Sequence, residues 1–406
     1  MERVIGLDLS KDSAEVAVLL PDREEPQRRR FAARPAALRK FAEQLGPDDR
    51  VVFESCTNAV AFHRLLCQHA GQVVVSNPMK TRIIAEAKVK TDKVDAEILA
   101  RLLAADFLPT VWVPDAATDQ LRHLVSHRHG LVKQRTQVKN RIHAILHRNL
   151  IAPDVSDLFG KAGRIFLKQV KLPATDRHLL DADLRTIDFL TAEIDSSEKC
   201  FAETCYRDPD IHRLMTIPGV SLVSAVALKA AIGEIGRFRA PANLVSYFGL
   251  NPAVYQSGKK AYNGHISRHG RSHARGICTE VAQQLVRVPG PFHAFFQRLR
   301  RRKPYNVAIT AVTRKLTVLV WHMLTRGEDY RYSPPALTRR KRNHLRRLAT
   351  GETTRRPRKG ESVPNPADDK TPGILGEQQY GDFIDERFGP DGPPDVNSSD
   401  EASKRT

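Results

Sequence analysis

One long helical pattern, TDQLRHLVSHRHGLVKQRTQVKNRIHAILHRNL from Thr118 to Leu150, most constrains how this chain can fold. Residues 176 to 204 form a second helical pattern, richer in acids, which can return antiparallel to the first. Two such helices make an elongated helical, coiled-coil-like connector, which we place at residues 113 to 208. The chain is therefore expected to hold one globular domain before this connector and another after it.

The polar face of the first long helix is almost wholly basic. It has no acid after Asp119, and its basic residues are Arg122, Arg128, Lys133, Arg135, Lys139, Arg141 and Arg148. The 406-residue chain as a whole has 65 Lys and Arg and a formal net charge of +19. Nucleic acid is the usual partner of such a protein, because phosphate neutralisation releases counterions, and a membrane surface is the weaker alternative. We expect Arg135, Lys139 and Arg141 to contact a nucleic-acid backbone.

The residues before the connector alternate between strand and helix patterns. Short apolar runs at residues 3–9 and 14–20 indicate a β-hairpin, and a third strand is expected near 28–32. A helix, a buried strand, a second helix and another strand follow at residues 35–45, 50–55, 57–70 and 72–78. This order predicts a mixed sheet covered by helices, an α/β domain over residues 1–112.

Four carboxylates stand where such a domain forms ligand sites, at strand ends and a helix start. Asp8 shares one face of the first strand with Gly6, and Glu54 ends the strand RVVFES. Asp92 and Asp95 lie one helical turn apart on one face. Carboxylates brought together repel one another unless divalent cations neutralise them, and Mg²⁺ takes such oxygen ligands. A pair of these ions can support phosphoryl transfer.

Each of these acids also has a plain structural explanation. Asp8 and Glu54 can be ordinary strand residues before a turn. Thr91 or Asp92 can cap a helix that has Asp95 in its first turn, and for this pair alone the cap is the stronger explanation. The presence of all four in a basic protein favours the metal site.

The region after the connector, residues 209–330, has the pattern of a mostly helical compact domain. Its stretch LMTIPGVSLVSAVALKAAIGEIGRF places Gly219 in an apolar-Gly-apolar turn before a helix pattern that ends at Gly233. This is the core of a helix-hairpin-helix, whose turn directs backbone N–H groups toward a phosphate. A plain helix-turn-helix packing unit fits the stretch equally well.

A long loop is expected between Pro252 and Ile277. The stretch has many Gly, Ser, His and basic residues and almost no apolar periodicity. Loops of this length in compact domains are usually functional or disordered. Its basic residues are candidates for phosphate contact, with a solvated basic loop as the alternative, and they include Lys259, Lys260, Arg268 and Arg271.

The five cysteines are scattered and odd in number, so neither a zinc site nor a disulfide framework is indicated. The N-terminal MERVIGLDLSKD has no long apolar run behind a basic start, and no segment approaches about 20 uncharged residues. We expect a cytoplasmic protein with no membrane association. Past Tyr330, basic runs and then a Pro-, Gly- and Asp-rich end predict a disordered tail over residues 331–406, whose basic part is a candidate contact to nucleic acid.

Three motifs of the first domain, V-I-G-L-D-L-S-K, V-V-F-E-S-C-T and K-T-D-K-V-D-A, occur in this order along the chain. Together they resemble the N-terminal RuvC-like domain of DEDD transposases of the insertion-sequence 110 type. The stretch L-V-K-Q-R-T-Q-V-K-N-R-I resembles the basic helix that follows this domain in the family. The resemblance implies a RuvC/RNase H-like fold. It also implies that the metal-binding acids, with Mg²⁺ as their ion, are Asp8, Glu54, Asp92 and Asp95.

The second domain carries a further resemblance, in Y-Q-S-G followed by G-H-I-S-R-H-G. It is similar to the family's transposase-type domain, in which the serine of the Ser-Gly pair is the nucleophile. The resemblance implies this role for Ser257, which by itself is an ordinary turn serine, and its local rivals are Ser267 and Ser272. A serine hydroxyl needs activation by a base, a cation or a metal, and nearby basic groups and the carboxylate-held Mg²⁺ are the available suppliers.

The resemblance implies an insertion-sequence transposase that cuts and rejoins DNA through a phosphoserine intermediate. Its implied partners are DNA at the element ends and the target, a structured guide RNA encoded by the element, and further copies of the chain, from dimer to tetramer. Its implied location is the bacterial nucleoid. Two alternatives stay open: a RuvC-like metal-dependent nuclease without serine chemistry, and a non-catalytic nucleic-acid-binding protein.

Overall fold

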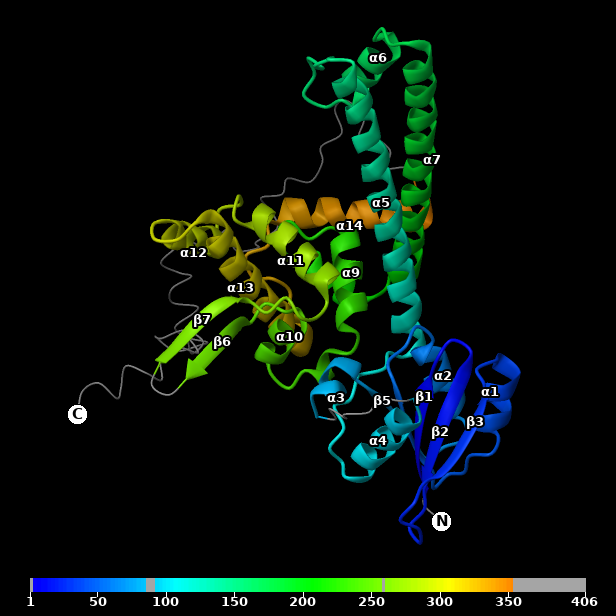
Figure 1. Ribbon diagram of the computed structural model, residues 1–406. Helices are drawn as coiled ribbons and strands as arrows, with labels where there is room; N and C mark the ends of the chain where they lie inside the picture. Colours follow the sequence, from blue (N-terminus) through cyan, green and yellow to red (C-terminus); the bar gives the residue numbers. More distant parts are fainter. Residues whose placement is uncertain (1–2, 85–91, 258–259, 353–406) are drawn as a thin grey trace, which may run out of the picture. The chain divides into compact units, whose positions relative to one another are not determined.

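The computed structural model describes residues 3–84, 92–257 and 260–352 (Figure 1). The chain divides into two compact units, Met1–Ala117 and a second unit that begins at Thr118. The first unit is an α/β domain and the second is mostly helical. Each unit has its own hydrophobic core.

A five-stranded sheet forms the centre of the first unit. Its strands are β1 (Val4–Leu9), β2 (Ser13–Leu19), β3 (Gln27–Ala32), β4 (Arg50–Glu54) and β5 (Gln72–Ser76). They lie in the order β3-β2-β1-β4-β5, in which β3, β2 and β1 are antiparallel and β1, β4 and β5 are parallel. This is the strand order of an RNase H-like fold. It confirms the predicted α/β domain and its five strands.

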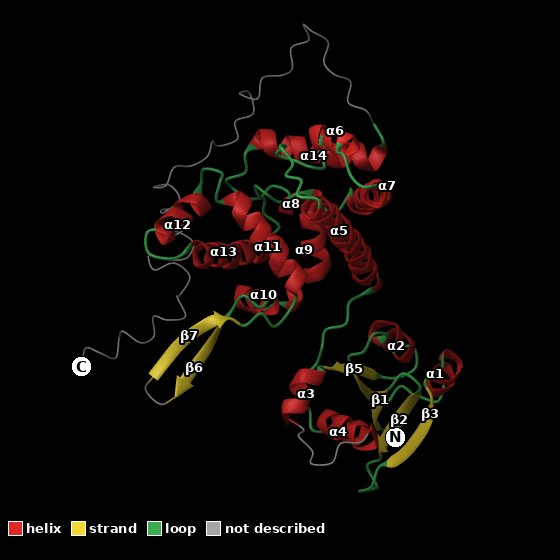
Figure 2. Ribbon diagram, turned by 45° about the horizontal axis from the view of Figure 1, so that its top comes forward, coloured by secondary structure: helices red, strands yellow, loops and turns green. Residues whose placement is uncertain are grey.

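Helices cover both faces of this sheet (Figure 2). They are α1 (Pro35–Ala42), α2 (Ala59–Leu66), α3 (Pro78–Ile84) and α4 (Asp92–Ala104). On one face, Ile5 and Leu7 of β1 join a large apolar cluster with α1 and α2. On the other face, Leu99 and Leu103 of α4 pack on Val52. Side chains alternate along each strand, so the two faces receive different residues of the same strand.

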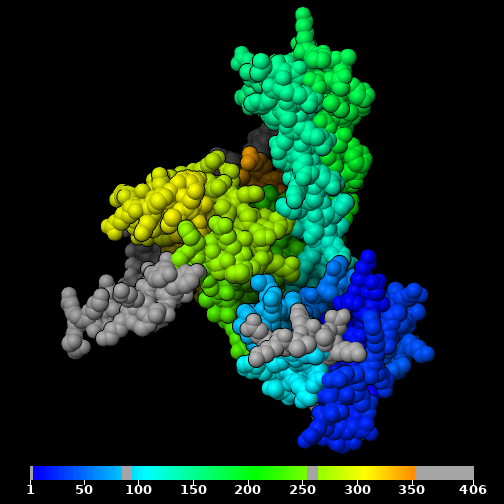
Figure 3. All heavy atoms as spheres, in the orientation of Figure 1, coloured from blue at the N-terminus to red at the C-terminus, as the bar shows by residue number. Residues whose placement is uncertain are grey.

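The second unit begins with a long helical hairpin. Its helices are α5 (Ala116–Arg148), α6 (Lys161–Gln169) and α7 (Ala174–Cys205). Buried Leu, Ile and Val side chains line the contact between α5 and α7. Arg148 pairs with Asp176 and Arg128 pairs with Glu198, so the two helices run antiparallel. The two predicted connector helices are confirmed, and Figure 3 shows them packed closely, in cyan and green.

The rest of the second unit is a group of helices with one two-stranded ribbon. The elements are α8 (Pro209–Leu214), α9 (Leu222–Ile232), η1 (Ile235–Arg237), α10 (Pro241–Tyr247), β6 (Pro252–Ser257), β7 (Lys260–Ile266), α11 (Ser272–Leu285), α12 (Pro291–Arg300), α13 (Tyr305–Arg326) and α14 (Pro335–Thr350). Helix α13 lies among the others and contacts α8, α10, α11 and α12. Of the described helices it alone is long and apolar enough to cross a membrane, and half of that apolar stretch is buried in the unit.

The long loop predicted between Pro252 and Ile277 is wrong for most of its length. Strands β6 and β7 pair antiparallel within it, and α11 begins at Ser272. The strands were missed because this stretch shows little of the apolar alternation from which strands are predicted. The start of α11 was not predicted because its buried residues, such as Ala274 and Val281, alternate with polar and basic residues on the exposed face.

The disorder predicted from residue 331 is wrong for α14. Thr338 and Leu345 of this helix are buried. The Lys341 ammonium donates hydrogen bonds to the carbonyls of Met215 and Ile217, at 2.8 and 2.7 Å. A narrow buried face therefore holds α14 against the rest of the unit, although the helix is otherwise strongly basic. The prediction failed because it relied on composition, which does not show such a face. Residues 353–406 of the predicted tail lie outside the described residues.

Candidate active site

Asp8 and Glu54 lie on neighbouring strands at one end of the sheet in the first unit. In the parallel pairing of β1 with β4, Leu7 stands opposite Phe53, so Asp8 and Glu54 form the next pair. Neighbouring strands lie about 4.8 Å apart, and residues in register share a face. The two acids therefore stand side by side at the carboxyl ends of their strands, on the face covered by α4.

Helix α4 crosses this face in the direction opposite to β1. Gly6 lies so close to it that a Cβ there would stand 2.0 Å from the Ala96 carbonyl oxygen. Arg50, at the beginning of β4, donates to the carbonyl of Leu103, near the end of α4, at 3.3 Å. The beginning of α4 consequently lies toward the carboxyl ends of the strands. Its first turns carry the other two predicted acids, Asp92 and Asp95.

The four acids thus belong to one end of one sheet, and their chemistry suits a hard divalent cation. Asp95 is half-buried, and the side chain of Asp92 lies outside the described residues. Among the described side chains, no three His, Cys, Asp or Glu residues are arranged to hold one ion. The set still fits Mg²⁺ by donor type, because all four side chains offer carboxylate oxygens, which this ion prefers.

A fifth carboxylate, Glu15 of β2, lies beside this group and was not among the predicted site residues. It stands opposite Asp8 in the β1–β2 pairing and is only 6% exposed. Its carboxylate pairs with the Arg30 guanidinium of β3 at 3.1 Å. The sequence could have predicted this pair. Asp8 and Glu15 lie equally far from the turn of the predicted hairpin, so they face each other across its two strands. A polar row therefore crosses the sheet through Arg30, Glu15, Asp8, Glu54 and Ser76.

The predicted nucleophile lies at the end of a ribbon in the second unit. Ser257 is the last residue of β6 and pairs with Lys260, the first residue of β7. Figures 1 and 2 show β6 and β7 projecting from the neighbouring helices. Gly258 and Lys259, between the strands, lie outside the described residues, and so do the side chains of Ser257 and Lys260.

The two rival serines lie at the other end of this ribbon. The Ser267 N–H donates to the carbonyl of Asn251 at 2.8 Å, and Ser272 begins α11. At about 3.3 Å per residue, the strand from Asn251 to Ser257 spans roughly 20 Å. The ribbon therefore separates Ser257 from both rivals.

Backbone contacts fix the base of the ribbon to α10. The N–H groups of Arg268 and Arg271 donate to the carbonyls of Gly249 and Tyr247 at 3.2 and 3.0 Å. Gly270 has φ +131°, and a Cβ there would stand 2.2 Å from the Tyr247 carbonyl oxygen. Glycine is required at this position for both its backbone angle and the close approach.

The chain matches two family models. Residues 5–150 match a model of the DEDD domain of IS110 transposases, described as "Transposase". Residues 211–297 match the model "Transposase IS116/IS110/IS902 family". The first match contains the four acids and the second contains Ser257.

The chain is an IS110-family transposase. As a transposase it is a DNA phosphoryl-transfer enzyme, and DNA binding belongs to that activity. The family also implies the use of divalent metal, which agrees with the oxygen-only donors at the sheet end.

Curated relatives of this transposase carry corresponding names. It is 28% identical over 342 residues to a "Probable family 20 transposase" of Pseudomonas aeruginosa, across 80% of this chain and 98% of that protein. It is 24% identical over 291 residues to the "Transposase for insertion sequence element IS1111A" of Coxiella burnetii, across 69% and 79%. It is 26% identical over 277 residues to the "Pilin gene-inverting protein" of Moraxella bovis, across 64% and 75%.

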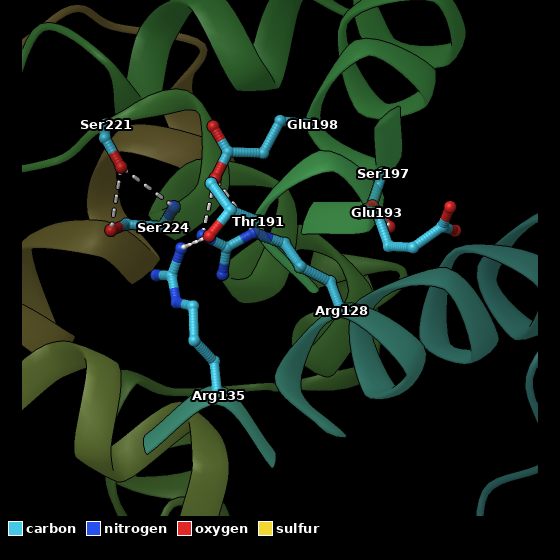
Figure 4. A network of polar contacts seen from close by, with 8 residues as sticks. All are labelled: Arg128, Arg135, Thr191, Glu193, Ser197, Glu198, Ser221 and Ser224. Atoms are coloured by element: carbon cyan, nitrogen blue, oxygen red, sulfur yellow. Dashed lines mark hydrogen bonds and ion pairs between the residues drawn. The ribbon is translucent and has the colours of Figure 1, made fainter. Parts of the chain in front are cut away.

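The basic residues predicted on α5 of the transposase have partners within the protein. Arg141 forms an ion pair with Asp183 of α7 at 2.5 Å, which raises the pKa of Arg141. Arg135 donates to the Thr191 hydroxyl at 3.2 Å, as Figure 4 shows. The Lys139 ammonium lies 4.7 Å from the centre of the Phe159 ring. These contacts order the basic face, and its contact with nucleic acid stays a prediction.

The turn with Gly219 joins α8 to α9 of the transposase, as a helix-hairpin-helix requires. Gly219 has φ +84°, and a Cβ there would stand 3.1 Å from the Val281 carbonyl oxygen of α11. The Ser221 hydroxyl accepts the N–H of Ser224 at 3.3 Å and caps α9 (Figure 4). The backbone angle favours glycine at 219 and the close packing leaves little room for a side chain, and the phosphate contact of Gly219 stays a prediction.

Of the basic residues Lys259, Lys260, Arg268 and Arg271 predicted for phosphate contact, Arg268 and Arg271 have described side chains, and both are exposed at the base of the ribbon. Arg268 has φ 57°, an uncommon angle for a residue with a side chain. The Arg271 guanidinium donates to the Tyr247 hydroxyl at 2.9 Å.

Proposed function

We propose that this transposase cuts and rejoins DNA through a covalent phosphoserine formed by Ser257. The observation that carries the proposal is the position of this serine at the end of a ribbon whose base is fixed to α10. Ser257 thus lies away from the fixed base of the ribbon, and we propose that it meets the scissile phosphodiester there. The rivals Ser267 and Ser272 lie at the fixed base instead.

In the cutting step, the Ser257 hydroxyl oxygen forms a bond to the scissile phosphorus. The bond from phosphorus to one deoxyribose oxygen breaks, that oxygen leaves with a proton, and the serine proton passes to a base. The number of phosphate ester bonds does not change. A second DNA hydroxyl can therefore displace the serine and rejoin the strand without ATP.

The sheet end of the first unit is the second half of this site. Asp8, Glu54, Asp92 and Asp95 would hold Mg²⁺, which when bound supplies positive charge against the charge that develops on the phosphate. The acids and Ser257 belong to different compact units. We infer that the complete site forms when the two units, from one protomer or from two, meet on DNA. We propose a dimer or tetramer as the active form, as the resemblance to the family implies.

The name of one relative supports rejoining as well as cutting. The Moraxella bovis protein is named for inverting a pilin gene. A gene is inverted only when DNA is both cut and rejoined. We extend that outcome to this transposase.

We further propose a guide RNA encoded by the element and action at the bacterial nucleoid. The basic face of α5 supports binding to a nucleic-acid backbone. Purified transposase should retain an element-derived RNA after a nuclease-controlled pull-down. If the pull-down does not enrich that RNA over its share of total cellular RNA, the proposed guide RNA is refuted.

A trapped covalent adduct tests the serine. With Mg²⁺ and a duplex of the element end, denaturing electrophoresis should show a protein–DNA adduct for the wild type and none for Ser257→Ala. Ser267→Ala, at the base of the same ribbon, is the matched control and should keep the adduct. An equal adduct yield in Ser257→Ala would refute the assignment.

Charge-neutral variants test the acids. Asp8→Asn and Asp92→Asn should lose recombination in cells while DNA binding stays within about twofold, because the acids act on the reaction and not on affinity. Unchanged recombination would reduce these acids to helix caps and strand ends. Cut DNA without any adduct from the wild type would instead identify a metal-dependent nuclease.

A further inference from the structure

Three guanidinium groups gather around Tyr247 of α10. Arg271, at the start of α11, donates to the Tyr247 hydroxyl at 2.9 Å, and Arg122 of α5 donates to it at 3.5 Å. The Arg237 guanidinium lies over the ring, 4.4 Å from its centre. These four residues, Arg122, Arg237, Tyr247 and Arg271, are called the arginine–tyrosine cluster below.

The end of α9 holds two of the three arginines in place. Arg122 donates to the carbonyls of Ala230 and Ala231 at 2.8 and 3.1 Å. Arg237 donates to the carbonyl of Ile232 at 2.9 Å. These two guanidinium groups are thus ordered before any ligand arrives, and a preordered group loses less entropy on binding. Arg271 is exposed at the edge of the cluster.

The cluster is strongly electropositive. Burial lowers the pKa of Arg122 and of Arg237, and the nearby Arg271 cation lowers both further. Burial acts to raise the pKa of Tyr247, yet the charges of the three arginines bring that pKa below its ordinary value. Cations that repel one another in this way are stabilised when an anion binds among them.

We propose that the arginine–tyrosine cluster binds one phosphodiester group of the nucleic acid that the transposase handles. The planar guanidinium offers paired N–H donors that match phosphate oxygens. The Tyr247 oxygen accepts hydrogen bonds from two arginines, so its own O–H can donate to the same phosphate. The chemistry fits DNA and RNA alike, and the test separates them.

This phosphate is not the one that Ser257 would attack. The cluster lies at the base of the ribbon, where Tyr247 also accepts the backbone N–H of Arg271. Ser257 lies at the far end of β6, roughly 20 Å along the strand from Asn251. The inference rests on the chain being a transposase and not on the serine, and its test measures binding alone, so either proposal can fail without the other.

The salt dependence of binding tests the cluster in the full-length protein. Anisotropy titrations would use one labelled sequence as duplex DNA, as single-stranded DNA and as duplex RNA. Arg271→Ala should weaken binding to the cognate form about tenfold and reduce the slope of log K against log salt by about 1. Arg271→Lys should keep the slope but recover only part of the affinity, because it lacks the paired donors. Tyr247→Phe should weaken binding with the slope unchanged.

Arg287 provides the matched control. It is an exposed arginine just beyond the other end of α11, a helix of 14 residues that spans about 21 Å. Arg287→Ala should leave affinity and slope unchanged, and equal effects of Arg271→Ala and Arg287→Ala would mean diffuse attraction and overturn the proposal. Unchanged binding in folded Arg271→Lys and Tyr247→Phe would overturn it too. The form of nucleic acid with the largest loss identifies the ligand.

Discussion

At Gly6 the absence of a side chain lets α4 lie directly on β1. The Ala96 carbonyl oxygen occupies the space that a Cβ would need, at 2.0 Å. This contact sets how far the first turn of α4, which carries Asp92 and Asp95, lies from Asp8 on β1. The glycine at position 6 thus controls the spacing between Asp8 and the two acids of α4.

Gly6→Ala should therefore destabilise the first unit. Pushing α4 off the sheet should cost about 1 to 3 kcal/mol in the free energy of unfolding, the usual range for overpacking. Urea unfolding of the full chain measures this. Gly130→Ala on α5, where no atom lies within 4 Å of the added Cβ, is the control and should gain up to about 1 kcal/mol. An unchanged midpoint for Gly6→Ala would contradict the close contact.

Lys341 gives the second unit a distinct pH dependence. Burial lowers the pKa of Lys341 to about 8, and the charge of Arg340 adds to the effect. Between about pH 8 and 10.5 the unfolded chain binds more protons at this residue than the folded chain, so its contribution to stability rises with pH. Allowing for partial solvent screening, the rise should be about 1 to 2 kcal/mol.

Urea unfolding across that pH window, for the wild type and for Lys341→Met, isolates the effect. The difference between the two proteins cancels the titration of tyrosines and cysteines. The wild type should gain stability relative to the variant as the pH rises. Parallel pH profiles would show that Lys341 keeps an ordinary pKa.

At the scale of elements, we expect the ribbon β6–β7 to behave as a rigid extension of α10 and α11. Its strands pair with each other, and its base is held by the backbone of Tyr247 and Gly249. The direction in which Ser257 is carried is therefore set at residues 267–271, several residues away from it. Changes at the base should move the hydroxyl without touching it.

Gly270→Ala tests this rigid connection. A Cβ 2.2 Å from the Tyr247 carbonyl oxygen should displace the base of the ribbon. We expect adduct formation with the element end to fall at least about tenfold, since a misplacement of about 1 Å can cost a hundredfold in rate. Gly276→Ala, on α11 with open space around it, is the control and should keep the adduct. Normal adduct yield in Gly270→Ala would show that the ribbon moves independently of its base.

Elements whose apolar residues recur with a clear period were predictable from the sequence, and elements without such a period were not. Short apolar runs revealed β1 and β4 and placed Asp8 and Glu54 at exposed positions of the sheet, but only the register brings the two acids side by side. The ribbon β6–β7 and the narrow face of α14 left no comparable period. Glu15 was missed for another reason, because a carboxylate in a strand looks solvated until the register places it between Asp8 and Arg30.

At the scale of the whole molecule, the chain consists of two compact units with separate cores. Separate cores of this size commonly unfold independently. Calorimetry of the full chain should then resolve two transitions. Gly6→Ala should lower only one of them, and Ile142→Ala, at a fully buried position between α5 and α7, should lower only the other. A single transition lowered by both variants would mean that the units unfold together.

The docking of α14 sets where the reading frame can be shortened. A stop codon that falls before Pro335 removes Leu345 from the core and leaves the carbonyls of Met215 and Ile217 without the Lys341 ammonium. A stop codon that falls after Gly351 spares every one of these contacts. Truncations that fall within this one helix should therefore take the second unit from stably packed to unstable.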